Sequence, residues 1–101
     1  MKQIIINLQE FGPILSNKVI GNRIYEIINE NTPKDNQIII DLQGIKSMAT
    51  FCAKQIFGRL FIELSPEIFH KNIILKNMSQ DVKASISLGI RYALKDGPSF
   101  F

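Results

Sequence analysis

Three isoleucine-rich segments constrain the fold of this chain more than any other feature. In residues 2–8, 37–42 and 72–76 an apolar residue recurs at every second position, the period expected of β-strands. One face of each segment is fully apolar, whereas the opposite face carries polar residues and a single isoleucine: Ile5, Ile39 or Ile74. A sheet covered by helices on both sides would need two apolar faces. The pattern therefore predicts a sheet with helices chiefly on one face.

The segments between and after these strands have the apolar period of helices. Helices are predicted to about Asn31, from Thr50 to Leu64, and from a start capped at Asn77 to about Leu94. Strand-helix-strand connections of this length should be right-handed crossovers between parallel strands. The predicted fold is α/β, a small β-α-β-α-β-α domain with a mainly parallel sheet.

Sequence signals for helix starts accompany each predicted helix. Ser16 or Asn17 can cap the first helix, and Thr50 is placed to cap the second. The run Asn77-Met-Ser-Gln80 resembles a capping box before the third. Ser65-Pro66-Glu67 is interpreted as a short turn that precedes the last strand.

Length and composition limit the classes of protein that fit. The 101 residues suit a single domain over 1–101, and 46% hydrophobic with 21% charged residues is typical of a folded, soluble chain. The sequence shows no cleavable signal sequence and no apolar run of membrane-spanning length, so we expect a cytoplasmic protein that does not bind a membrane. The lone Cys52 and lone His70 argue against a disulfide and most metal sites.

The charge pattern bears on nucleic-acid binding. The net charge of +3 is mild and the basic residues are scattered, so binding to nucleic acid is not indicated. The alternative is an RNA- or DNA-binding α/β domain that uses the more polar sheet face. Lys2, Lys76, Arg91 and Lys95 would then contact phosphates.

The predicted helix 50–64 carries two apolar stripes. Its core stripe consists of Ala53, Ile56, Phe57, Leu60, Phe61 and Leu64. A second, narrow stripe on the far side consists of Phe51, Gln55, Gly58 and Ile62. Large apolar residues in this stripe either pack under a neighbouring segment or form a protein interface that begins at the helix start. In the second case Phe51 and Ile62 should be at least partly exposed.

No residue set suggests an enzyme. Asp41 and Gly44 are expected to structure the loop after the second strand, with Asp41 accepting hydrogen bonds from loop amides. Cys52 and His70 lack a third group to orient them as a nucleophile pair. The isolated glycines form no phosphate-binding motif. We therefore predict no catalytic residue, no metal and no cofactor.

Several short motifs together resemble a known family. Asp41-Leu-Gln-Gly-Ile45, Met48, Thr50 and Ile56-Phe-Gly-Arg-Leu60 resemble the pattern of STAS domains, the fold of anti-sigma-factor antagonists. A bacterial STAS-like family of uncharacterised proteins is the closer match, through Phe11-Gly12, Ser16, Gly21, Arg23, Asp41 to Ile45 and Phe51 to Leu60. The resemblance extends from about Ile4 to Leu94.

The resemblance implies a non-enzymatic regulator that binds another protein. STAS antagonists bind an anti-sigma factor with a kinase-like ATP site and are released when a serine at the helix start is phosphorylated. That serine aligns with Phe51, and the usual aspartate aligns with Ala49. We therefore expect the phosphoswitch to be lost, and favour Thr50 as a helix cap over Thr50 as a phosphosite.

The expected partner is a kinase-like ATPase or an anti-sigma-type regulator, again by resemblance. It is expected to bind at the start of the predicted second helix and along its second stripe. The predicted partner-binding residues are Ala49, Thr50, Phe51, Gln55, Gly58 and Ile62.

Overall fold

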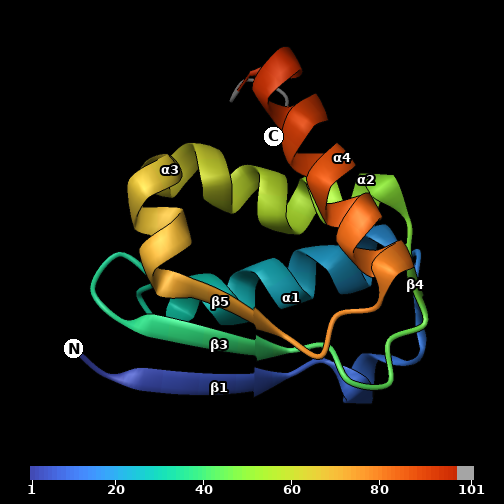
Figure 1. The fold of residues 1–101 in the computed structure, drawn as a ribbon, viewed down its shortest axis with the longest axis horizontal. Helices are drawn as coiled ribbons and strands as arrows, with labels where there is room; N and C mark the ends of the chain where they lie inside the picture. Colours follow the sequence, from blue (N-terminus) through green and yellow to red (C-terminus); the bar gives the residue numbers. More distant parts are fainter. Residues whose placement is uncertain (98–101) are drawn as a thin grey trace.

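The computed structural model describes residues 1–97 of the chain as a layer of helices over a small sheet (Figure 1). The elements, in chain order, are β1 (Gln3–Asn7), the 3₁₀ turn η1 (Gln9–Phe11), β2 (Ile14–Leu15), α1 (Lys18–Glu30), β3 (Gln37–Asp41), β4 (Ser47–Met48), α2 (Thr50–Ala53), the π-helical turn η2 (Lys54–Gly58), α3 (Arg59–Asn72), β5 (Ile73–Lys76) and α4 (Gln80–Asp96). The α/β class is confirmed. No helix among these residues is long and apolar enough to cross a lipid bilayer.

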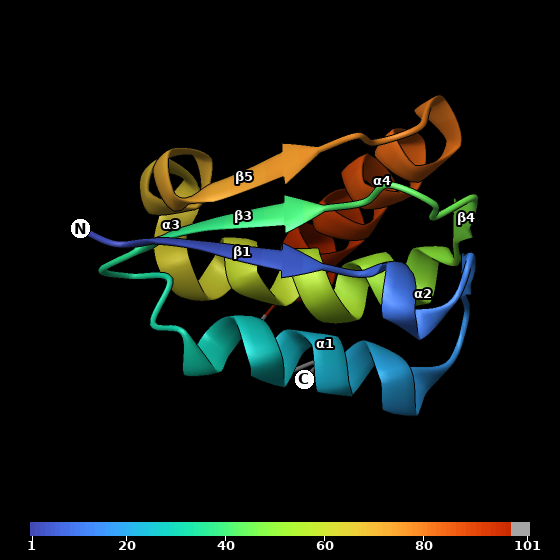
Figure 2. The same ribbon diagram turned by 90° about the horizontal axis from the view of Figure 1, so that it is seen from below.

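The main sheet is parallel in the order β1-β3-β5, as the crossover rule predicts. Its helices lie on one side, and the other side is open (Figure 2). Ile5 aligns with Ile39, and Ile39 with Ile74, so the three outward isoleucines form one row across the open face. Ile40 on the covered face is 0% exposed, whereas Ile5 is 72% exposed. The one-sided arrangement inferred from the strand pattern is confirmed.

The core lies between the sheet and the helices. Its buried members come from every strand and helix, with the central helix contributing the largest fully buried side chain, Phe57. The predicted core positions Ala53, Ile56, Phe57 and Leu60 are buried, and Phe61 and Leu64 are half-buried at its margin. The predicted core stripe of this helix is therefore essentially correct.

The central helix is longer and less regular than the sequence suggested. It continues through η2 and α3 to Asn72, and bends at Ser65, whose φ of 75° lies outside the helical region. Pro66 follows, and a residue before proline is disfavoured in the helical conformation. The turn predicted at Ser65-Pro66-Glu67 is therefore only a bend at Ser65. Residues 66–72 are helical, and the last strand begins at Ile73. His70 consequently lies in the helical segment after the bend.

Two of the predicted helix starts are wrong by one or two residues. Asn17 caps α1 as expected, since its Oδ1 accepts hydrogen bonds from the Val19 and Ile20 amides at 2.8 and 3.1 Å. Ala49, not Thr50, is the N-cap of α2, and no side chain caps that end. Ser79, not Asn77, caps α4 by accepting from the Val82 amide.

A close crossing joins η2 to α4. A Cβ atom at Gly58 would lie 2.9 Å from the Gly89 carbonyl oxygen, and one at Gly89 would lie 2.5 Å from the Lys54 amide nitrogen. Only glycine at both positions allows the two backbones this approach. Gly89 therefore packs closely against the central helix.

Candidate functional site

The start of α2 is fixed by backbone contacts to β2. In the short parallel ladder between β2 and β4, Leu15 aligns with Met48, and both side chains are buried. The Ala49 amide then donates to the Leu15 carbonyl oxygen at 2.8 Å. The Ala49 carbonyl accepts from the Cys52 and Ala53 amides, each at 3.0 Å, which begins the helix. This small ladder was not foreseen, because two-residue strands carry no detectable alternation.

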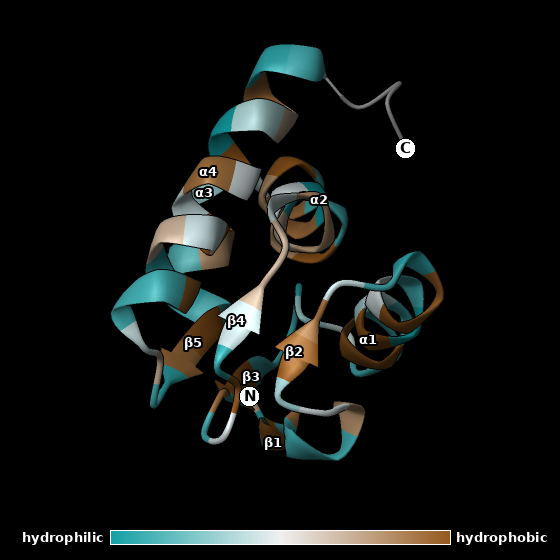
Figure 3. Cartoon of the chain, turned by 90° about the vertical axis from the view of Figure 1, so that its right-hand side faces the viewer, coloured by the Kyte–Doolittle hydropathy of each residue, from teal (hydrophilic) through white to brown (hydrophobic). Residues whose placement is uncertain are grey.

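The start of α1 is held against the same end of the central helix. The Gln55 side-chain amide donates to the Lys18 carbonyl oxygen at 2.9 Å, and Cys52 Sγ lies 3.5 Å from the Asn17 carbonyl oxygen. Gly21 makes room for this contact, since a Cβ there would lie 2.2 Å from Gln55 Oε1. The starts of α1 and α2 and the β2–β4 ladder therefore form one rigid end of the molecule, which faces the viewer in Figure 3.

Three large apolar side chains are exposed at this end. Ile14 in β2 is 61% exposed, Val19 in α1 is 76% exposed and Phe51 in α2 is 44% exposed. We call these three residues the end patch. Ala49 and Thr50, both half-buried, lie next to Phe51 in the chain. Two of the end-patch residues, Ile14 and Val19, were not among the predicted site residues. Each stands next to another apolar residue, Leu15 or Ile20, and the sequence does not tell which of the two is exposed.

The remaining predicted partner-binding residues do not continue this exposed surface. Gly58 is buried under α4, and Gln55 lies in the contact with α1 described above. Ile62 is half-buried further along the helix. The stripe was derived with a constant helical turn, but η2 is a π turn that holds an extra residue and rotates the later part of the helix. The second stripe is therefore not one continuous exposed face.

Asp41 and Gly44 shape the loop after β3. Asp41 Oδ1 accepts hydrogen bonds from the Gln43 amide at 3.0 Å and from Asn77 Nδ2 at 2.9 Å. The bond from Asn77, and then that from Gln43, holds the pKa of Asp41 below its ordinary value. Gly44 has a φ of +84°, a conformation that favours glycine. Asp41 thus ties the loops after β3 and β5 together as a carboxylate.

Beside this loop lies a shallow groove of about 570 Å³ at the carboxyl end of the sheet. Ligands of α/β proteins often bind at this end. The Ser79 hydroxyl in its wall is used to cap α4. Within residues 1–97 there is also no cluster of three histidine, cysteine, aspartate or glutamate side chains that could hold a metal ion.

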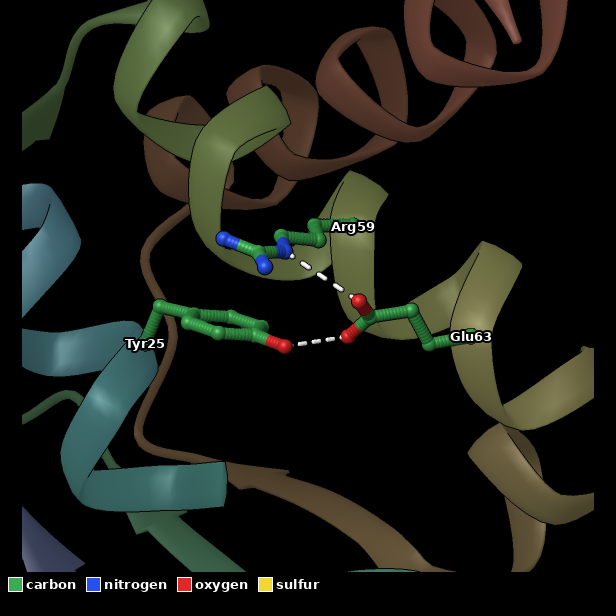
Figure 4. Close-up of polar contacts among 3 residues, drawn as sticks. All are labelled: Tyr25, Arg59 and Glu63. Atoms are coloured by element: carbon green, nitrogen blue, oxygen red, sulfur yellow. Dashed lines mark hydrogen bonds and ion pairs between the residues drawn. The ribbon is translucent and has the colours of Figure 1, made fainter. Parts of the chain in front are cut away.

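A polar cluster joins α1 to α3 (Figure 4). The Tyr25 hydroxyl donates to Glu63 Oε1, and Arg59 Nε lies 3.2 Å from Glu63 Oε2. The Arg59 guanidinium also stacks over the Tyr25 ring at 4.0 Å from its centroid. Burial, and then the bond to Glu63, raises the pKa of Tyr25 to about 12. The Tyr25 phenol stays neutral at physiological pH and keeps its hydrogen bond to Glu63, so this cluster fastens α1 to α3.

Cys52 and His70 are not brought together by the fold. Cys52 is buried at the start of the central helix, and burial raises the pKa of its thiol. His70 lies near the other end of that bent helix, where its ring centroid is 5.8 Å from Phe61 and 5.7 Å from Phe69. A buried thiol with a raised pKa is a poor nucleophile.

A family model now places the chain among known proteins. The model of a STAS-like domain of unknown function (DUF4325) matches residues 21–83, which is more than half of the 101 residues. The chain belongs to this STAS-like family. No curated protein and no solved structure matches it.

The matched segment of this STAS-like domain runs from α1 to the first turn of α4 and includes the start of α2. Within it, position 51 is a phenylalanine that cannot accept phosphate, and position 49 is an alanine that serves as N-cap. Thr50, the adjacent hydroxyl, is the first residue of the helix and makes no capping hydrogen bond. The helix start of this STAS-like domain thus presents the apolar side chain of Phe51, which is 44% exposed.

Proposed function

We propose that this STAS-like domain is a non-enzymatic regulatory module that binds another protein through its end patch, Ile14, Val19 and Phe51, together with Ala49 and Thr50. The single observation that carries the proposal is the exposure of Phe51, an aromatic residue at the start of a helix whose other phenylalanines are buried or half-buried. Aromatic anchors dominate the energetics of many protein interfaces.

The surroundings of Phe51 support an interface on physical grounds. The segments that carry the end patch are held by backbone hydrogen bonds and by the Gln55 contact, so little ordering would be needed on binding. Two exposed lysines are near it in the backbone: Lys18 precedes Val19, and the Lys46 amide donates to the carbonyl oxygen of Pro13, which precedes Ile14. A complementary partner surface would offer an apolar pocket with acidic residues around it.

By family resemblance the proposed partner is a kinase-like ATPase or an anti-sigma-type regulator. Binding would be constitutive and not controlled by a phosphoserine, since Phe51 occupies that position. Nucleic-acid binding is not favoured by the geometry. Lys2 and Lys76 lie at opposite ends of the parallel sheet, and Arg91 and Lys95 lie on α4, in the helical layer.

The test is affinity capture from lysate of the source cells, quantified by mass spectrometry. Phe51→Ala should reduce capture of the specific partner by over tenfold, since an anchor of this kind contributes about 2 kcal/mol or more. Tyr92→Ala is the matched control, because Tyr92 is also 44% exposed but lies on α4. Equal capture by the wild type and Phe51→Ala would refute the proposal.

A further inference from the structure

The outer edge of β1 has none of the usual protection against pairing with another strand. Strand edges are normally guarded by charged residues, proline or bulges. β1 reads Gln-Ile-Ile-Ile-Asn, with neither charge nor proline, and Ile5 at its centre is 72% exposed. The other edge of the sheet carries a charge within its strand, since β5 ends in the exposed Lys76, whereas the nearest charge to β1 is Lys2, just before the strand begins.

The backbone direction of β1 shows which groups face outward. The Gln37 amide donates to the Lys2 carbonyl oxygen, and the Leu8 amide donates to the Asp41 carbonyl oxygen. Backbone groups of successive residues in a strand point alternately to opposite sides. The even-numbered residues of β1 therefore bond to β3, and the N–H and C=O groups of Gln3, Ile5 and Asn7 face the free edge.

The geometry points to a homodimer in which β1 pairs antiparallel with β1 of a second copy, with the two-fold axis at Ile5. Ile5 then lies opposite Ile5 of the second copy, and Gln3 lies opposite Asn7. Each opposed pair exchanges two backbone hydrogen bonds, because all three residues present outward N–H and C=O groups. The strand matches itself when reversed, since a carboxamide residue stands on each side of the central isoleucine.

The side chains on the open face favour the same register. In each copy Ile5, Ile39 and Ile74 form a row that ends at Ile5, at the edge of the sheet. Pairing at Ile5 would join the rows of the two copies into one apolar stripe across both sheets. The carboxamides of Gln3 and Asn7 would lie side by side and can hydrogen-bond to each other. No like charges meet along this pairing.

The helical side of the edge also has apolar surface to cover. α1 runs along β1 at this border of the molecule (Figure 2). The buried residues of α1 form a stripe along the helix, and Tyr25, which bonds to Glu63 of α3, lies on one side of it. Ile20 and Ile27 lie on the other side of this stripe, away from α3. These two residues and Ile4 are only partly buried. A second copy at this edge would cover them further.

Charge complementarity occurs at the two ends of the pairing. In this register Lys2 of one copy lies opposite Leu8 of the other copy. Glu10, in η1, is two residues beyond Leu8, so it comes near Lys2 of the first copy. Lys2 and Glu10 are both exposed. The two-fold axis brings a lysine near a glutamate at both ends of the paired strands. This attraction favours the proposed register over a register in which one strand is shifted along the other.

Analytical ultracentrifugation of the intact chain tests the inference. The wild type should sediment as a species of twice the 11.5 kDa chain mass. Ile5→Lys should weaken the dimer by over tenfold, because it sets two ammonium groups side by side at the axis. Leu94→Lys is the matched control, since Leu94 is 57% exposed but lies on α4 and not at the β1 edge. This variant should remain dimeric, and thermal melts should show that both variants fold.

Cross-linking tests the register independently of that variant. Opposed residues of a hydrogen-bonded antiparallel pair have Cα atoms about 5.5 Å apart, within disulfide range. In a Cys52→Ala background, Ile5→Cys should therefore form an interchain disulfide on mild oxidation, and Ile74→Cys should not. A monomeric wild type would overturn the inference and leave the edge to a strand of another protein. A dimer that survives Ile5→Lys, or cross-links equally well at position 74, would overturn it too.

Discussion

Phe51 and Phe57 lie on the same bent helix, yet they belong to different regions of the molecule. Phe57, in the π turn, is 0% exposed and sits between the sheet and the neighbouring helices, whereas Phe51 at the helix start is 44% exposed. The same residue type therefore stabilises the fold in one region and leaves apolar surface uncovered in the other. The difference suggests that stability and binding can be separated experimentally within one helix.

The largest expected effect is in the covered region of the sheet. Ile40→Asp should unfold the domain, because an unpaired buried charge costs several kcal/mol against a total stability of about 5 to 15 kcal/mol. Ile5→Asp, in the neighbouring strand, should leave the monomer folded because Ile5 is largely exposed. Circular dichroism and thermal melts distinguish the two. A cooperative melt of Ile40→Asp would show that the covered face tolerates charge.

Phe57→Ala should come next in size. Removing a fully buried phenylalanine leaves a cavity and costs about 3 to 5 kcal/mol. Urea denaturation at fixed temperature measures the loss in the free energy of unfolding. A loss below about 1 kcal/mol would mean that the middle of the helix is packed no better than its start, and the contrast between the two regions would disappear.

Tyr25→Phe should have a smaller effect, because it removes one hydrogen bond to Glu63 while keeping the ring under Arg59. The expected cost is about 1 kcal/mol. Since the folded-state pKa is raised from 10.0 to about 12, the stability that the phenol contributes is present below pH 10 and is lost as the pH rises toward 12. The difference in melting temperature between wild type and variant should shrink over this range. A difference that grows there would contradict the assigned proton donor.

Thr50→Ala should have the smallest effect on stability, within about 0.5 kcal/mol, because Thr50 is the first helical residue and not the cap. The sequence alone suggested a cap worth about 1 kcal/mol. Chemical denaturation of the variant decides between the two values. Intact mass spectrometry of protein from its native cells should also show no stoichiometric phosphate on Thr50, whereas phosphate there that alters partner binding would revive the switch.

The sequence was informative where a periodic pattern spans a whole element. Alternation in the three strands predicted a parallel sheet covered on one side, and the covered row around Ile40 and the open row around Ile5 bear this out. The apolar period of residues 50–64 likewise identified Phe57 as core. These patterns can be read from the sequence because a strand buries every second side chain and a helix buries every third or fourth.

Prediction failed where geometry depends on contacts between distant segments. The π turn at Lys54–Gly58 has no local sequence rule, and it moved Gly58 from the predicted binding stripe to the crossing with α4. Ala49 begins a helix because Leu15, far back in the chain, accepts its amide hydrogen bond. Ile14 and Val19 became candidate binding residues only once the fold brought their segments next to Phe51.

The central claim is that the helix start serves binding and the helix middle serves stability, and the Phe51→Ala variant tests it most directly. Its free energy of unfolding should fall by only about 1 kcal/mol, because 44% of Phe51 is already exposed, while partner capture should fall by over tenfold relative to Tyr92→Ala. A stability loss of about 3 to 5 kcal/mol, as expected for a core phenylalanine, would contradict the claim, as would unchanged capture.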